Sequence, residues 1–103
     1  MMQVVDHEPR SWFLMRDGDR LYLDVNCNHG AFGYSVLIEL DGSERRALDE
    51  QGRGYLHELA DAVHMSAPAA RDSTSPYRDR DQSRTYGTAT SEAVAAWRRS
   101  GGS

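Results

Sequence analysis

The chain is poor in the residues that usually build a protein core. Among its 103 residues, Leu, Ile, Val and Phe number 17. That share is below the roughly 20% at which disorder becomes a concern, although the net charge of −4 is too small to add to it. The longest run of large aliphatic residues is Val36 to Ile38, far short of the ~20 residues that span a bilayer. We therefore expect one small domain that does not enter a membrane.

Lysine is absent, and cysteine occurs once. A single cysteine, Cys27, cannot form an internal disulfide, which excludes the disulfide framework of small extracellular proteins. Residues 1–10 include four ionisable side chains and lack the apolar stretch of a signal peptide. We expect a small, bacterial-type cytoplasmic protein.

The chain also lacks the basic surplus of a nucleic-acid-binding protein. The chain has sixteen Asp and Glu residues and twelve Arg residues, and its pI is about 5.5. A duplex-binding protein typically carries a basic stripe and a high pI. The nearest candidate, Arg78, Arg80 and Arg84, is interleaved with Asp79 and Asp81, which cancel most of its field. Nucleic acid is therefore not an expected partner.

The apolar residues are distributed unevenly along the chain. Between Ser66 and Ala93 there is no Leu, Ile, Val, Met, Phe or Trp. Such a stretch offers little material for a core and is rich in the residues typical of loops. We expect a folded core over residues 1–65 and a loop-rich, partly flexible segment over residues 66–103.

Three segments have the apolar and polar pattern of half-buried strands. Residues 11–16 are largely apolar and run into the turn signal Asp17-Gly18-Asp19. Residues 21–27 alternate cleanly, and residues 34–40 alternate again after a loop rich in Asn and Gly. Three strands with short links predict an antiparallel meander with one face exposed to solvent.

A helical pattern follows the strands. Asp41 with Glu44 resembles a capping box, and apolar residues at helical spacing predict one long helix over about 44–65. Gly52 lies on the same stripe, so a break there is the alternative to a continuous or slightly kinked helix. A short helix is expected at about 90–99. The fold class is therefore α+β: a three-stranded β-meander packed on one long α-helix, followed by the loop-rich segment.

The strongest candidate site is a surface of aromatic and acidic side chains on the outward face of the sheet. One of Trp12 and Phe13 must face outward, because neighbours in a strand alternate. Exposed aromatic residues with an acidic rim are typical of a partner-binding surface. The candidate residues are Trp12, Tyr22, Asp24, Phe32, Tyr34, Leu37, Glu39 and Trp97. The alternative, equally weighted, is that residues 66–99 fold back over this face and that Trp97 docks there.

Catalytic and metal sites receive weaker support. Cys27, His29, His57 and His64 could hold a metal ion or form a thiol active site, but their spacing matches no zinc motif and no cysteine-nucleophile signature. Cys27 lies an even number of residues from Leu21 and Leu23, so its side chain is expected on the same side of the strand, which favours burial. Carboxylates are plentiful, but no pair is singled out among Asp17, Asp19, Asp24, Glu39, Asp49, Glu50, Glu58 and Asp61.

The sequence therefore favours a protein with no cofactor and no catalytic residue. We expect a non-catalytic protein-interaction module, of the adaptor or toxin-neutralising type, whose acidic surface would steer a basic partner. The partner would be another protein or a second copy of the chain. The alternative is a small thiol enzyme or metal-binding protein built on Cys27 and the three histidines.

Overall fold

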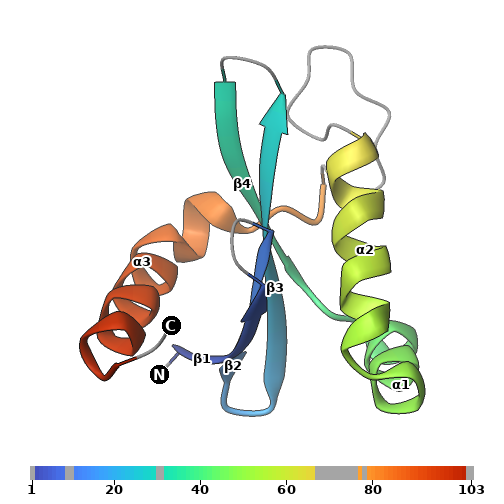
Figure 1. Ribbon diagram of the computed structural model, residues 1–103, viewed down its shortest axis with the longest axis horizontal. Coiled ribbons are helices and arrows are strands. Elements are labelled where there is room, and N and C mark those ends of the chain that lie inside the picture. The colour runs from blue at the N-terminus through green and yellow to red at the C-terminus, as the bar shows by residue number, and fades with distance from the viewer. Residues whose placement is uncertain (1, 9–10, 30–31, 67–76, 78, 102–103) are drawn as a thin grey trace.

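The computed structural model describes residues 2–8, 11–29, 32–66, 77 and 79–101. A four-stranded antiparallel sheet lies between α1 and α2 on one face and α3 on the other (Figure 1). The elements are β1 (Met2–Glu8), β2 (Trp12–Asp17), β3 (Arg20–His29), β4 (Phe32–Glu39), α1 (Gly42–Gln51), α2 (Arg53–Ser66) and α3 (Ser83–Arg99). The predicted α+β class is confirmed, but the meander has four strands instead of three, and the described part holds three helices.

β1 is the strand that the sequence analysis missed. Its register with β2 shifts between Val4 and Asp6, so that Val5 sits in a bulge and is 54% exposed. A bulge interrupts the alternation of the two faces. Val4 accordingly packs with the α3 side of the core, whereas Asp6 lies opposite Leu14, which belongs to the α2 side. Because of this shift, β1 lacks the regular alternation of apolar and polar residues that identifies a strand in a sequence.

The β2–β3 hairpin forms where the Asp-Gly signal predicted it. Asp17 pairs with Arg20, and Gly18 has a φ of 60°, which glycine adopts without strain. β3 then pairs with β4 over its length, and Leu23 lies opposite both Leu14 and Ile38. This register places one row of large aliphatic side chains across the centre of the sheet.

The prediction of one long helix is wrong, because the chain breaks at Gly52. This residue has a φ of 70° and a ψ of −157°, and its N–H donates to the carbonyl oxygen of Leu48 at 2.8 Å. Glycine reaches this conformation at no steric cost, so it ends α1 and lets α2 start in a new direction. The break allows α2 to run along the sheet while α1 packs beside it (Figure 1).

The capping box at the start of α1 is confirmed. Asp41 Oδ1 accepts from the N–H of Glu44 at 2.8 Å, and Glu44 Oε1 accepts from the N–H of Asp41 at 2.9 Å. The hydrogen bond from the Glu44 backbone, aided by that from Ser43, holds the pKa of Asp41 below its ordinary value of 3.8. Two of the backbone donors at the helix start are satisfied in this way.

Replacing Asp41 with alanine is expected to lower the free energy of unfolding by about 1 kcal/mol at neutral pH. Because the pKa of Asp41 is depressed by folding, its stabilisation is present above the unfolded pKa and is lost as the pH falls through the folded one. Urea unfolding at neutral and acidic pH measures both effects. Asp49→Ala, an exposed change on the same helix, is the control; equal losses for the two variants would contradict the capping role.

The larger core lies between the sheet and α2. Its central members, Leu23, Val36, Ile38 and Val63, have no exposed surface. Burial of a large aliphatic side chain contributes about 1.5–3 kcal/mol, so this cluster is the main source of stability. The remaining buried members are Trp12, Leu14, Val25, Cys27, Leu40, Leu56, Leu59 and Ala60.

A second core lies between the sheet and α3. It consists of Met2, Met15, Tyr22, Leu37 and Ala93, all buried. Partly buried side chains from both layers pack around it: Val4, Phe13, Tyr86 and Val94. The helix predicted at 90–99 is the second half of α3, which begins at Ser83 because the polar residues of its first turns hide the helical period. The far face of the sheet is therefore covered by the chain's own C-terminal helix.

Three residues, which we call the edge strap, lead the chain around β4 toward α3 (Figure 1): Arg80, Asp81 and Gln82. Gln82 donates its N–H to the carbonyl oxygen of Leu37 at 2.7 Å, and the N–H of Leu37 donates to Asp81 Oδ1 at 3.1 Å. Much of the predicted loop, residues 67–76, lies outside the described residues. The division into a 1–65 core and a 66–103 segment stays a prediction.

Candidate functional site

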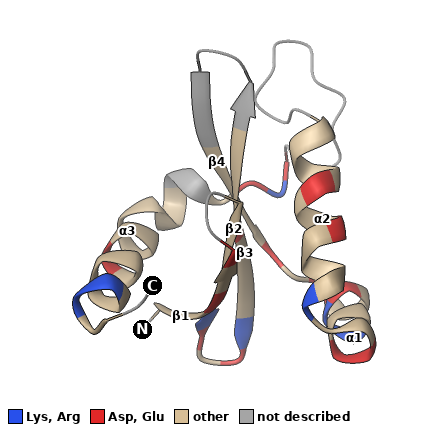
Figure 2. Ribbon diagram, viewed as in Figure 1, with Lys and Arg blue, Asp and Glu red and all other residues tan. Residues whose placement is uncertain are grey.

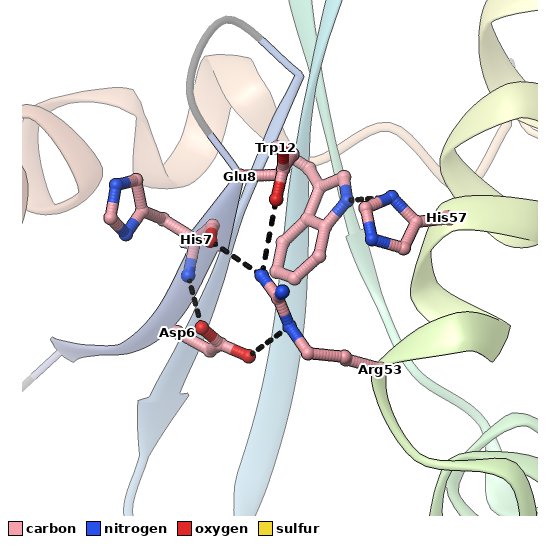
Figure 3. Close-up of polar contacts among 6 residues, drawn as sticks. All are labelled: Asp6, His7, Glu8, Trp12, Arg53 and His57. Atoms are coloured by element: carbon pink, nitrogen blue, oxygen red, sulfur yellow. Dashed lines mark hydrogen bonds and ion pairs between the residues drawn. The ribbon is translucent and has the colours of Figure 1, made fainter.

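Trp12 faces α2 and does not belong to an exposed surface. It is 1% exposed, and its Nε1 donates to His57 Nδ1 at 3.4 Å (Figure 3). The guanidinium carbon of Arg53 lies 5.4 Å from the centre of the indole ring. Phe13 is the member of the pair that faces the other side, where its ring lies 5.6 Å from Trp97. The sequence left this choice open, and the structure assigns Trp12 to the core.

Tyr22 and Leu37 lie on the outward face, as their parity predicted, but α3 covers them. Each is 1% exposed, and the ring of Tyr22 lies 5.7 Å from that of Tyr86 on α3. Trp97 packs edge-on against His7, with 4.5 Å between the ring centres. This arrangement corresponds to the alternative in which the C-terminal segment folds back. The expected exposed aromatic patch is therefore not formed by these residues.

Asp24 and Glu39 are partly buried beside this second core. Burial, and then the nearby charge of Asp81, raise the pKa of Asp24 from its ordinary 3.8 to about 6. Asp24 lies opposite Leu37 in the β3–β4 register, and Leu37 is the residue that the edge strap binds. The carboxyl group of Asp24 is thus part of the junction between sheet and strap. The side chains of Phe32 and Tyr34 lie outside the described part of the structure.

Arg53 binds the exposed edge of the sheet at β1. Its Nε donates to Asp6 Oδ2 at 3.2 Å, and its Nη2 donates to the carbonyl oxygen of His7 at 2.9 Å and to Glu8 Oε2 at 3.3 Å (Figure 3). Because the carbonyl of Glu8 accepts from Ser11 inside the hairpin, that of His7 points to the outer edge. The N–H of His7 donates to Asp6 Oδ1 at 2.8 Å. The backbone N–H and the carbonyl oxygen of His7 at this edge are therefore both hydrogen-bonded to side chains.

The opposite edge is closed in the same manner at β4. Both backbone groups of Leu37 bind the edge strap, and Arg80 Nη2 donates to the carbonyl oxygen of Glu39 at 2.8 Å. Unpaired strand edges are templates for another strand, and proteins protect them with charged side chains and bulges. The sheet is thus protected against added strands at His7, Leu37 and Glu39.

The residues of the catalytic alternative are not brought together in the described part of the chain. Cys27 has no exposed surface. His57 and His64 line a cleft whose lining does not include Cys27, and the side chain of His29 is outside the described residues. No group of three or more His, Cys, Asp or Glu side chains that could hold a metal ion occurs among the described residues.

Cys27 is expected to resist labelling in the folded protein. A thiol reacts as the thiolate and must reach the reagent, whereas this one is enclosed by the larger core. Addition of a thiol reagent at neutral pH should give a slow reaction that becomes at least about a hundredfold faster in urea, since only unfolded molecules react. Fast labelling of the native protein would contradict this burial and would reopen the thiol hypothesis.

The described residues form a cleft of about 500 Å³ between α2 and the β3 side of the sheet, which we call the α2–β3 cleft. Val25 and Ala60 form its apolar surface. Five polar residues complete its lining: Ser11, Asn26, His57, Asp61 and His64. The volume is within the range of about 300–1,000 Å³ that is typical of small-ligand sites. α2 supplies the imidazoles and the carboxylate because positions 57, 61 and 64 recur on one side of a helix.

The exposed flank of α2 adjoins this cleft. We define it by Glu58, Asp61 and Met65, which are spaced to share one side of the helix. Met65 is 76% exposed, and both carboxylates are exposed. Among the described residues neither carboxylate forms an ion pair. The one arginine of α2 is Arg53, at the start of the helix, so the rest of α2 carries acidic charge (Figure 2).

No protein-family model, curated protein or solved structure matches this chain. Among the helices of the described residues, none is long and apolar enough to cross a membrane. Any assignment of function therefore rests on the geometry of the chain itself.

Sequence reasoning noted the carboxylates of the α2 flank but did not select them. Met65 was not among the candidate residues. The usable signal was the spacing of Glu58, Asp61 and Met65, which places all three on the side opposite Leu59 and Val63.

Proposed function

We propose that this protein is a non-catalytic interaction module, of the adaptor or toxin-neutralising type, which binds a partner with a basic surface through the flank of α2. The observation that carries the proposal is Met65, 76% exposed on the same side of the helix as two carboxylates that form no ion pair with another described residue. An exposed methionine supplies adaptable apolar contact, and the carboxylates supply charge complementarity.

The closure of the sheet supports the choice of this flank. α3 covers the outer face, α2 covers the inner face, and side chains occupy both edges at the positions described above. The net charge of −4 would attract a basic partner over longer distances. The proposal places the protein in the cytoplasm, where a single reduced cysteine is usual.

Capture of partners from the native host tests the proposal. The full chain is immobilised as wild type, as Glu58→Gln/Asp61→Asn/Met65→Ala, and as the control Asp49→Asn/Glu50→Gln. Both variants lose two negative charges, but the control changes α1, where both side chains are exposed. We expect a basic protein to bind wild type and control and to bind the α2 variant at least about tenfold less, as for a central contact of an interface.

Three results would overturn the proposal. An equal loss of binding in both variants would indicate a response to net charge alone. A chain that remains a monomer by size-exclusion mass and captures no protein would remove the partner; a dimer insensitive to the α2 changes would assign self-association to another surface.

A further inference from the structure

We propose that the α2–β3 cleft is the anchor site of this surface and that it takes an arginine side chain of the partner. This inference rests on the proposed function and names the chemistry that would be recognised. Asp61 belongs both to the exposed flank and to the lining of the cleft, so it joins the two features. A partner that contacts the flank lies directly over the opening.

The charge of the cleft fits a cation. Asp61 is the one carboxylate among the described residues that line it, and no arginine is among them. The nearest arginine along α2 is Arg53, one turn before His57, and its guanidinium is held by Asp6, Glu8 and the ring of Trp12. Within the described part of the chain no arginine lies beside Asp61 in the cleft, so the charge there suits a cation.

The shape and hydrogen-bonding groups favour arginine over lysine. A guanidinium is planar and presents a fork of N–H donors, which needs several acceptors and flat surfaces. Asp61 and the Ser11 hydroxyl are acceptors, whereas Val25 and Ala60 offer apolar contact to the methylene stem. Lysine would use the carboxylate but would gain little from the flat rings.

His57 contributes a flat ring whose orientation is held by Trp12. Its Nδ1 accepts from Trp12 Nε1 at 3.4 Å, so the neutral ring carries its proton on Nε2. Such a ring offers no acceptor to a guanidinium but provides a face for stacking. His64, from the next turns of α2, lines the same cleft. The arrangement thus selects a planar cation next to a carboxylate.

Titration by two-dimensional NMR of the full chain tests this site. The probe is acetyl-Gly-Arg-Gly-amide, and the matched probe carries citrulline, which has the shape of arginine without its charge. We expect saturable shifts at Asn26, His57, Asp61 and His64, with a Kd of order 1 mM or weaker for so small a probe. Binding of the citrulline peptide should be at least about tenfold weaker, as should binding of the arginine peptide to Asp61→Asn. Asp49→Asn should bind as wild type does.

Equal binding of the arginine and citrulline peptides, or unchanged binding by Asp61→Asn, would overturn the assignment. If the peptide does not bind but capture of the partner still depends on α2, the anchor site is wrong and the proposed function stands. If the arginine peptide binds at the cleft but capture of the partner does not respond to the α2 changes, the proposed function is wrong and the arginine site stands.

Discussion

Replacing Arg80 with alanine is expected to lower the free energy of unfolding by about 3 kcal/mol, because it leaves a buried carboxylate without its partner. Arg80 Nη1 donates to Glu44 Oε2 at 2.9 Å, and Glu44 is 8% exposed. The same guanidinium binds the carbonyl oxygen of Glu39, so the change also removes one of the hydrogen bonds between the edge strap and β4. The expected loss lies at the lower end of the range of about 3–5 kcal/mol for breaking a buried ion pair, because the Arg80 side chain is 31% exposed.

Urea unfolding of Arg80→Ala measures this loss, and Arg46→Ala, an exposed change on α1, is the control. Arg80→Lys should recover part of the stability, because it restores the charge without the fork of donors. A loss for Arg80→Ala no larger than that for Arg46→Ala would contradict the role of Arg80 as the partner of the buried Glu44 carboxylate.

Replacing Asp24 with asparagine is expected to stabilise the protein above pH 6 by up to about 3 kcal/mol. The pKa of Asp24 is raised from 3.8 to about 6, mainly by burial and then by Asp81, and each unit of pKa corresponds to about 1.4 kcal/mol. A raised folded pKa means that stability from this group is complete below the unfolded pKa and is lost as the pH rises through about 6. Asparagine stays neutral and does not undergo this loss.

The measurement is the difference in unfolding free energy between Asp24→Asn and wild type, determined in urea from pH 4 to pH 8. The difference should be small at the acidic end and should grow through pH 6. Asp79→Asn, an exposed carboxylate near the edge strap, is the control and should show no such rise. A difference that is independent of pH would contradict the burial of the charge at Asp24.

Much of the fold was predictable because local chemistry dictated it. The Asp-Gly turn, the capping box of Asp41 and Glu44, and the alternation of residues 21–27 each act within a few residues of chain. β1 was hidden because its bulge at Val5 cancels the alternation on which strand prediction depends. The sequence allowed either a continuous helix or a break at Gly52. The packing of α2 on the sheet favours the break, and such long-range packing cannot be seen in a local sequence pattern.

The candidate site was less predictable, since exposure depends on contacts between distant parts of the chain. Parity placed Tyr22 and Leu37 on the outward face, but only the position of α3, more than forty residues later in the sequence, decides that they are buried. The polar first turns of α3 concealed how far that helix extends. Conversely, Met65 follows helical spacing and is exposed, because α2 meets the sheet through Leu56, Leu59 and Val63 instead.

These observations give one account of the surface. The chain covers both faces of its sheet and protects its edges at His7, Leu37 and Glu39, and we propose that a partner meets the acidic flank of α2 and the adjoining α2–β3 cleft. The competing account is that α3 is displaced and that the partner binds the apolar face around Tyr22 and Leu37. The two accounts differ in where a partner protects the backbone.

Amide hydrogen exchange of the full chain, alone and with the protein captured from its host, tests the central claim most directly. Our account predicts that binding slows exchange in α2 around Glu58 to Met65, with α3 and β4 unchanged. Faster exchange in α3 together with new protection at Leu37 would contradict it, because the partner would then have replaced α3 on the sheet.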